Sequence, residues 1–378
     1  MVFSDVIPRL ELRSFRNYCR AEFTLAPGLN LLTGANGTGK TNVLEAIYYL
    51  AVLRSFRTRQ IRDLVAWGAE SFQIKADVRR PDFSAATLRL AAGFGREREI
   101  SLNSAPVGKG SEFIHQFLCT AFIPEDIELA RGPSAERRRF LDILSSQLDG
   151  AYLHDLHQFA QALKSRNAML RQPQRFGRRE TGVFETILVR HGAAVMMRRR
   201  RTIRILRQRV LEDAPAFHGE MPPRLELAYD PGVVKAVRPG EEEEEQTLAA
   251  RYETALMESL EANRARDEQE RLTTWGPQRD DLALFISGKP LAAFGSEGQC
   301  RTFALLLRLS SARLLLEAAA GRRGVVLLID DVLGELDAAR RAAFWRLLPR
   351  QAQLFFACTA PPAEIPADLA VTIHPVSP

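Results

Sequence analysis

Residues 29–47 read L-N-L-L-T-G-A-N-G-T-G-K-T-N-V-L-E-A-I, and the rest of the chain is best interpreted from them. The first five residues are apolar enough for a short buried strand, and the residues from Asn42 onwards have the spacing of an amphipathic helix. Between them lies G-x-x-x-x-G-K-T, the phosphate-binding loop pattern, in the strand–loop–helix context that it requires. The alternative is a glycine-rich turn that matches by coincidence, which is disfavoured because every fixed position is filled.

The residue types of this loop suit a nucleoside triphosphate. Glycines allow backbone conformations that are closed to residues with a Cβ atom, so successive N–H groups can turn towards phosphate oxygens. Lys40 can reach the β and γ phosphates, and the Thr41 hydroxyl can bind Mg²⁺. The predicted ATP-contacting residues of the loop are Gly34, Ala35, Asn36, Gly37, Thr38, Gly39, Lys40 and Thr41.

A pair of carboxylates supplies the second half of the predicted site. The run at 325–329 is apolar throughout, as in a strand buried on both faces, and it ends in Asp330 and Asp331. A carboxylate at the end of a central strand is where a phosphate-loop ATPase holds Mg²⁺, so we assign Asp330 to the metal. Asp331 is predicted to polarise the attacking water, which gives Lys40, Asp330 and Asp331 as catalytic candidates. The alternative is an ordinary acidic turn after a strand.

A third motif, F-G-S-E-G-Q at 294–299, precedes a long helical pattern at 297–319. Ser296 is placed to cap that helix, and Gly298 lets a ligand approach the backbone. A helix N-terminus with a serine hydroxyl is a second anion site. Because one ATP does not need two helix N-termini so far apart in sequence, we expect Ser296, Gly298 and Gln299 to contact the nucleotide of another subunit.

The composition is that of an ordinary soluble protein with an excess of basic over acidic residues. The chain has 378 residues, a net charge of +6 and a pI of about 9.3. The arginine surplus favours phosphate contacts or reflects an arginine-rich proteome. Four cysteines without a C-x-x-C pair indicate reduced thiols. The N-terminal residues have no signal-peptide pattern, and no apolar run is long enough to span a membrane. We therefore expect a cytoplasmic protein without a membrane partner.

The periodicity predicts an α/β fold in which an ATPase lobe with a β-rich subdomain is interrupted by a mostly helical second lobe. The predicted segments are 1–130, 131–274 and 275–378. Strands are expected at 6–13, 23–25, 29–33, 72–78, 87–90, 99–102, 120–123, 282–286, 325–329 and 353–358. Helices are expected from Lys40 to about Leu53 and at 134–148, 151–171, 182–212, 247–266, 297–319 and 338–348, with Ser134 as an N-cap. The five acids from Glu241 to Glu245 predict an exposed, mobile loop without a catalytic role.

Two basic segments are candidates for DNA contact. Arg57, Arg59 and Arg62 follow the first helix and either touch a nucleic-acid backbone or belong to a solvated loop. Segment 186–211 holds eight arginines and no acid, so some of them must be exposed. Arg199 and Arg200 are the candidates there, and the alternative is that these arginines pair with acidic neighbours in the helical lobe.

The order of G-A-N-G-T-G-K-T, F-G-S-E-G-Q, L-L-I-D-D and E-L-D resembles the ATP-binding-cassette pattern of chromosome-maintenance and repair ATPases. Residues 124–142 and 330–344 narrow the resemblance to the RecF family of bacterial recombination-mediator ATPases, as do S-F-R-T at 55–58 and G-P-Q-R-D-D at 276–281. The matches run from residue 13 to about 345. Three positions depart from the family pattern, namely Gln278, Glu297 and Gly334, and they leave details of the dimer interface open.

This resemblance implies a weak, DNA-stimulated ATPase that uses ATP and Mg²⁺. Two copies would sandwich two ATP molecules, with each Ser296 completing the partner's site and Asp337 at the dimer contact. The dimer would bind gapped DNA or single-strand/duplex junctions and, with RecR and RecO, help to load the recombinase RecA. Slow hydrolysis, consistent with the short side chain of Asp331, would act as a release timer.

Other ATP-binding-cassette classes fit less well. Only 289 positions separate Thr41 from Asp330, and they contain β-like segments and many prolines instead of the sustained heptads of a long coiled coil. A transporter cassette would lack the helical insertion, and a nuclease would need an added metal-binding domain. The remaining alternative is a nucleotide-gated scaffold that binds partner proteins without touching DNA.

Overall fold

The computed structural model describes residues 6–82, 84–108, 110–218, 223–232, 245–334 and 336–376. The chain forms two compact units: unit 1 consists of 1–127, 212–222 and 301–378, and unit 2 of 128–211 and 223–300. These boundaries differ from the predicted ones mainly at 275–300, which belongs to the helical unit because its strand β10 (Asp281–Ile286) pairs with β9 (Leu225–Asp230) there. Of the acidic run 241–245, which was expected to be a loop, residues 241–244 lie outside the described residues, and Glu245 is instead the exposed first residue of helix α8 (Glu245–Glu270).

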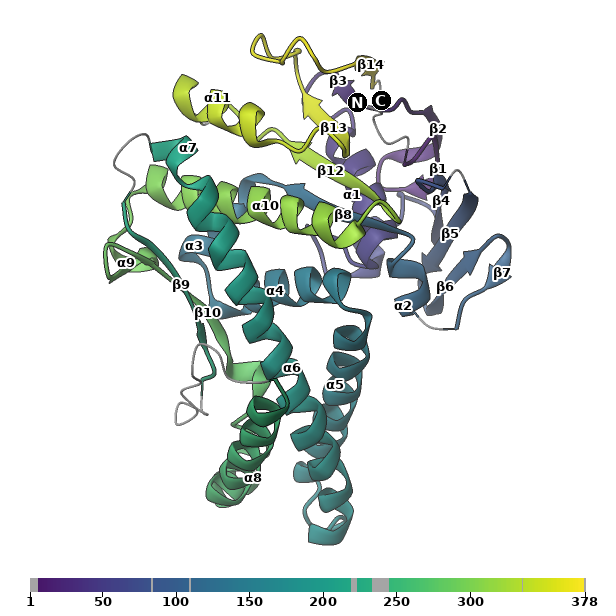
Figure 1. The fold of residues 1–378 in the computed structure, drawn as a ribbon. Coiled ribbons are helices and arrows are strands. Elements are labelled where there is room, and N and C mark those ends of the chain that lie inside the picture. The colour runs from purple at the N-terminus through teal and green to yellow at the C-terminus, as the bar shows by residue number, and fades with distance from the viewer. Residues whose placement is uncertain are drawn as a thin grey trace. The chain divides into compact units, whose positions relative to one another are not determined.

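Unit 1 contains a five-stranded parallel sheet of order β14-β3-β13-β12-β8 (Figure 1). Three of its strands are buried at every position, as in a sheet covered on both faces. Helix α1 (Lys40–Val52) packs against the sheet, and α11 (Ala338–Leu347) packs on it through Phe344 and Trp345. The strands are β3 (Leu29–Thr33), β8 (Phe117–Phe122), β12 (Gly324–Asp330), β13 (Gln353–Cys358) and β14 (Val371–Pro375).

A second, antiparallel sheet of unit 1 has the order β2-β1-β4-β5-β6-β7. Buried and partly exposed residues alternate along β4, so one face of the sheet is apolar, as the period-2 pattern predicted. The strands are β1 (Arg9–Phe15), β2 (Tyr18–Thr24), β4 (Ser71–Arg79), β5 (Ala85–Gly93), β6 (Arg96–Leu102) and β7 (Ala105–Pro106). The short helices of this unit are η1 (Ile61–Leu64), α2 (Gly110–Ile114), η2 (Pro124–Asp126) and α7 (Pro215–His218).

Unit 2 is mainly helical, as predicted. Residues of α6 and α8 form an apolar core around Trp275, in which Val189, Met196, Tyr252 and Leu256 are buried. Its helices are α4 (Ser134–Leu148), α5 (Gly150–Leu170), α6 (Arg178–Asp213), α8 (Glu245–Glu270), η3 (Pro277–Arg279) and α9 (Leu291–Phe294). A small antiparallel sheet consists of β9, β10 and β11 (Lys289–Pro290). The helices α3 (Ile127–Arg131), α6 and α10 (Glu297–Ala319) continue across the limits of the two units.

Three local expectations are corrected. Strands β9 and β14 were not predicted, because β9 lies between prolines and β14 is an edge strand of mixed composition, whose residues alternate between exposed and half-buried. Ser134 is not an N-cap: Pro133 occupies that position, and the Ser134 hydroxyl instead accepts a hydrogen bond from Arg138.

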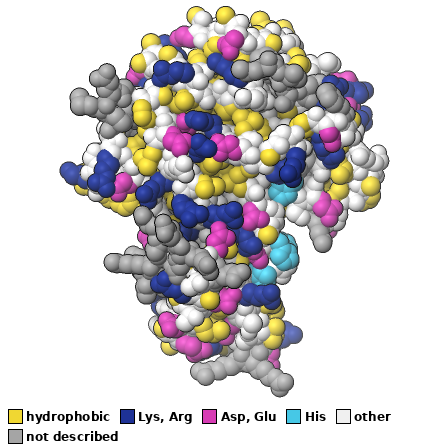
Figure 2. Space-filling model, viewed as in Figure 1, with side chains coloured by type: hydrophobic (Ala, Val, Ile, Leu, Met, Phe, Trp, Pro, Cys, Tyr) yellow, Lys and Arg dark blue, Asp and Glu magenta, His cyan; other side chains and the backbone are white. Residues whose placement is uncertain are grey.

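Among the described residues, no helix is long and apolar enough to cross a bilayer. On the face drawn in Figure 2, the basic side chains are interspersed with acidic ones. The net charge of +6 therefore does not form one continuous basic field on that face.

Candidate nucleotide site

The phosphate-binding loop lies between the end of β3 and the first turn of α1. Gly34, Gly37 and Gly39 all have positive φ angles, of 155°, 84° and 111°. A Cβ atom on Gly34 would lie 2.5 Å from the carbonyl oxygen of Val376, and one on Gly39 would lie 2.7 Å from the Asn17 side chain. Both backbone conformation and space therefore require glycine at these two positions.

The side chains predicted to hold phosphate and metal belong to the first two residues of α1. The Lys40 ammonium reaches back over the loop and donates to the carbonyl oxygens of Gly34 and Ala35, each at 2.7 Å. The next residue points elsewhere: Thr41 Oγ1 donates to Asp330 Oδ1 at 2.9 Å, although the two residues are 289 positions apart. A hydroxyl and a carboxylate oxygen in contact suit Mg²⁺, which prefers oxygen ligands. The parallel sheet makes this contact, because β3 and β12 end at the same edge.

The two consecutive aspartates have different environments. Asp330 is 9% exposed, and burial raises its pKa to about 6, although the hydrogen bond from Thr41 acts in the opposite direction. Asp331 is exposed and has a φ of 51°, in the left-handed region that non-glycine residues rarely adopt. The backbone turn after β12 thus separates a buried carboxylate that contacts Thr41 from an exposed one that faces solvent.

The turn between β1 and β2 supports the loop from outside, which the sequence did not reveal. The Asn17 side chain donates to the carbonyl oxygen of Thr38 at 3.0 Å, and the Tyr18 hydroxyl donates to that of Gly39 at 3.2 Å. Asn42 in turn donates to Asn17 Oδ1 at 2.7 Å. These bonds fix carbonyl oxygens on the outer side of the loop. The local sequence R-N-Y indicates only a polar turn, so nothing in it pointed to this role.

A second unpredicted contact centres on Glu45, which is fully buried in α1. Arg16 binds both of its carboxylate oxygens, at 2.7 and 2.6 Å, and Ser55 Oγ donates to Oε1 at 2.5 Å. Arg57 Nη1 lies 3.8 Å from the same carboxylate and 2.8 Å from Asn42 Oδ1. One signal was available: an acid in the middle of an otherwise apolar helix needs buried partners.

The predicted second anion site begins helix α10. Ser296 Oγ accepts a hydrogen bond from the backbone N–H of Gln299 at 3.2 Å, and the Gln299 side-chain oxygen accepts one from the Ser296 N–H at 2.8 Å. This reciprocal pair is a capping box and confirms that Ser296 caps the helix. Ser296 and Glu297 are exposed, and Gly298 and Gln299 are half-buried.

The segment after β12 ends in another cap. Asp337 accepts a hydrogen bond from the backbone N–H of Arg340 at 2.8 Å and so begins α11. Gly334, one of the departures from the family pattern, is exposed, and a Cβ atom there would meet nothing within 4 Å. The small residue at this position is therefore not required by packing inside this chain.

The prediction that Arg199 contacts DNA is wrong. Arg199 is only 2% exposed and binds Asp142 at 2.8 Å, Asp280 at 2.9 Å and the carbonyl oxygen of Pro277 at 2.7 Å. Burial raises the pKa of Asp280 to about 6, and the neighbouring guanidinium opposes that rise. The alternative, that an arginine of α6 pairs with acids in the helical unit, is correct for Arg199, which holds the G-P-Q-R-D-D stretch in place.

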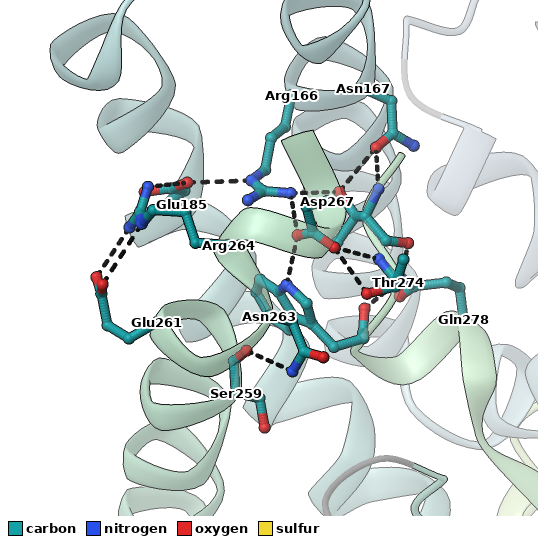
Figure 3. Close-up of polar contacts among 12 residues, drawn as sticks. Arg166, Asn167, Glu185, Ser259, Glu261, Asn263, Arg264, Asp267, Thr274 and Gln278 are labelled. Atoms are coloured by element: carbon teal, nitrogen blue, oxygen red, sulfur yellow. Dashed lines mark hydrogen bonds and ion pairs between the residues drawn. The ribbon is translucent and has the colours of Figure 1, made fainter. Parts of the chain in front are cut away.

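Figure 3 shows a second buried charge network in unit 2. Arg166 joins α5 to Glu185 of α6 at 3.1 Å and to Asp267 of α8 at 2.7 Å. Asp267 also accepts hydrogen bonds from Thr274 and from the Trp275 indole. These bonds order the residues just before Gln278. That side chain donates to backbone carbonyls while its buried oxygen has no hydrogen-bond partner among the described residues.

The other candidate DNA-contacting arginines are at least partly exposed. Arg57, Arg59 and Arg62 lie on the surface between α1 and β4, and the Arg62 side chain is 67% exposed. Arg57 also contacts Asn42 in the first turn of α1, so it lies beside the phosphate-binding loop. Arg200 is half-buried on α6. DNA contact by these four residues stays a prediction.

Comparisons with known proteins agree with this geometry. A family model described as RecF/RecN/SMC N terminal domain matches residues 6–368. The chain is 32% identical over 360 residues to the DNA replication and repair protein RecF of Bacillus cereus (strain G9842), covering 94% of this chain and 92% of that protein. The protein of the same name from Bacillus mycoides (strain KBAB4) matches at 32% identity over the same shares.

Two solved structures are also similar. The recombination mediator protein RecF with ATPrS in the RecFOR pathway superposes with a TM-score of 0.83 at 28% identity, covering 98% of this chain and 97% of that chain. The corresponding structure with ATP has the same TM-score and identity, with coverages of 96% and 94%. The α/β fold is therefore shared over nearly the whole chain.

Proposed function

Since the chain belongs to the RecF family of DNA replication and repair ATPases, we propose that it is an ATP-dependent DNA-binding protein of recombinational repair and replication-fork maintenance. The observation that carries the proposal is the contact of Thr41 with Asp330 beside the phosphate-binding loop. It joins the three parts of a nucleotide site, which are a glycine-rich loop, a lysine and a pair of metal-binding oxygens.

Each group of this site has a defined task in the proposal. The loop residues 34–41 hold the phosphates, and Lys40 moves from the loop carbonyls to the β and γ phosphates. Thr41 and Asp330 would hold Mg²⁺, which would supply positive charge against the phosphate oxygens. Asp331, exposed after β12, orients and polarises the attacking water. Hydrolysis is weak and DNA-stimulated, so ATP acts mainly as a switch.

The switch is dimerisation. Ser296 and Glu297 are exposed at the beginning of α10, where N–H groups and a hydroxyl can meet the phosphates bound by a second copy. In the dimer, Ser296, Gly298 and Gln299 complete the partner's site, with Asp337 at the contact. Hydrolysis removes the γ phosphate that both copies hold, and the dimer then releases DNA.

The dimer binds gapped DNA or single-strand/duplex junctions in the cytoplasm. Arg57, Arg59, Arg62 and Arg200 are its candidate backbone contacts, and RecR, with RecO and the recombinase RecA downstream, are the proposed partners. Arg57 contacts Asn42 and lies near Glu45, both of which belong to α1. A DNA contact at Arg57 would therefore change the contacts of the first turn of α1, which follows the phosphate-binding loop.

The test measures fluorescence anisotropy of a labelled gapped duplex titrated with the protein in ATP–Mg²⁺ or in ADP–Mg²⁺. We expect much tighter binding with ATP and a steep loss of affinity with salt. Lys40→Met is the matched control that should bind equally in both nucleotides. Binding that ignores the nucleotide would contradict the switch, and no binding in either state would favour the partner scaffold.

A further inference from the structure

Trp67 is the most exposed large apolar side chain in the described part of the chain. Its relative exposure is 102%, whereas Trp275 and Trp345 are 1% and 2% exposed. It lies in the turn between η1 and β4. A tryptophan removes a large apolar area from water when it is covered, so a fully solvated one is a candidate binding residue.

The turn that carries Trp67 is fixed to the antiparallel sheet of unit 1. The backbone N–H of Ala66 donates to the carbonyl oxygen of Ser14 at 2.8 Å, and the N–H of Ala69 donates to the carbonyl oxygen of Ala66 at 3.0 Å. Val65 pairs with Phe15 of β1. Because the residues on either side are held, the backbone of the turn is preorganised, and little of its conformational entropy is lost when Trp67 binds.

A second aromatic side chain lies on the neighbouring turn. Phe94 is 55% exposed, and its backbone N–H donates to the carbonyl oxygen of Glu70 at 2.9 Å, three residues after Trp67. Both turns lie at the same end of the sheet, because Ser71 of β4 pairs with Gly93 of β5. Two flat, exposed rings therefore emerge from adjacent, anchored turns.

The segment that carries Trp67 has an excess of basic residues, which argues for a nucleic-acid partner. Residues 54–70 contain four arginines (Arg54, Arg57, Arg59 and Arg62) and two acids (Asp63 and Glu70), which gives a local charge of +2. An exposed aromatic in an arginine-rich segment is a combination with which proteins bind single-stranded nucleic acid, with arginines along the phosphates and bases stacked on the ring. A protein-binding hot spot would instead lie within a packed apolar surround.

We propose that Trp67 is a stacking platform for an unpaired base, and that it gives the protein its preference for the single-stranded part of a DNA substrate. This inference rests on the proposed DNA-binding function and adds a specificity-determining residue to it. Phe94 extends the same platform. Because bases in an intact duplex are stacked on each other, only gaps, junctions and single strands can use it.

The arrangement of the three tryptophans allows a direct test. In ATP–Mg²⁺, the protein is titrated with a single-stranded oligothymidylate while tryptophan emission is recorded. Stacking should quench the emission of Trp67 and protect it from iodide, and Trp67→Phe should remove the DNA-sensitive part of the signal. Trp275 and Trp345 are buried and should contribute a constant background.

Affinity measurements separate this inference from the function on which it rests. Trp67→Ala should weaken binding to a gapped duplex roughly 5- to 100-fold, while binding to a fully paired duplex stays nearly unchanged. Met257→Ala, at a residue 46% exposed on α8, is the matched control and should alter neither. If DNA binds without changing the emission of Trp67, or if Trp67→Ala binds the gapped duplex normally, the platform is disproved and the DNA-binding function stands. If no DNA binds at all, both are disproved.

Discussion

Replacing Arg166 by methionine tests whether the buried charge network of unit 2 stabilises the helical core. The Arg166 guanidinium is 1% exposed and donates to Glu185, Asp267 and Thr273 at 3.1, 2.7 and 2.8 Å. Methionine replaces the aliphatic part of the arginine side chain but carries no charge. The variant Arg166→Met therefore leaves the fully buried Asp267 carboxylate without its cationic partner.

The expected loss of unfolding free energy depends on which contacts the two buried acids keep. Breaking one side of a buried ion pair costs about 3–5 kcal/mol, because the other charge stays buried. Asp267 keeps its hydrogen bonds from Thr274 and Trp275, and Glu185 keeps Arg264 at 3.3 Å. These contacts place the loss at the lower end, about 3 kcal/mol. Since a whole domain is stable by only about 5–15 kcal/mol, that loss is large.

The loss is measured by urea unfolding, monitored through the fluorescence emission of Trp275. Because Trp275 donates to Asp267, this emission reports on the unfolding of unit 2. A background of Trp67→Phe and Trp345→Phe leaves Trp275 as the single tryptophan. The second change removes an indole N–H that is buried without a partner among the described residues. The matched control is Arg266→Met on the same helix as Asp267, which removes an ion pair with Glu270. The Arg266 side chain is 64% exposed, so the loss of this solvated pair should hardly change the free energy of unfolding. Equal losses in the two variants would refute the reasoning, because the buried guanidinium would then contribute no more than a solvated one.

Four further outcomes are expected. Lys40→Met should abolish ATP-driven dimerisation, so an unchanged sedimentation profile with ATP would contradict the assigned phosphate site. Asp331→Asn should bind ATP and prolong the dimer, and normal hydrolysis by this variant would assign the water-polarising role elsewhere. Ser296→Ala should keep ATP binding by the monomer but weaken the dimer, as equilibrium dialysis and sedimentation would show. Burial raises the pKa of Tyr18 to about 12, so its stabilising contribution is complete below pH 10 and is lost as the pH rises to 12. Absorbance of tyrosinate near pH 10 should therefore be the same in Tyr18→Phe as in the parent protein.

Those parts of the fold that depend on local pattern were predictable. Buried strands such as β3 and β12 are continuous apolar runs, and the helices of unit 2 have clear apolar spacing, so their positions agree closely with the prediction. The contact of Thr41 with Asp330 was also expected, because parallel strands that end at one edge bring their last residues together.

What could not be predicted depends on tertiary packing. Four consecutive arginines at 198–201 look alike in sequence, but only the structure shows that the face with Arg199 is turned to buried acids. The hydrogen bonds of Asn17 and Tyr18 to the phosphate-binding loop join segments that no short motif connects. Strand β14 lacks an apolar run, because an edge strand needs only one covered side.

The position of β3 in its sheet has a consequence for protein synthesis. This strand lies between β13 and β14, and its residue Asn30 contacts Leu354, 324 positions later. At roughly 5–20 residues per second, the ribosome needs about 16–65 seconds to make the neighbours of β3 after β3 itself has emerged. The strand that leads into the phosphate-binding loop therefore waits with both edges unpaired, which exposes the nascent chain to aggregation. The nucleotide site is encoded early but can assemble only late, so the nascent chain would depend on chaperones to shield that strand, and for longest where translation is slow.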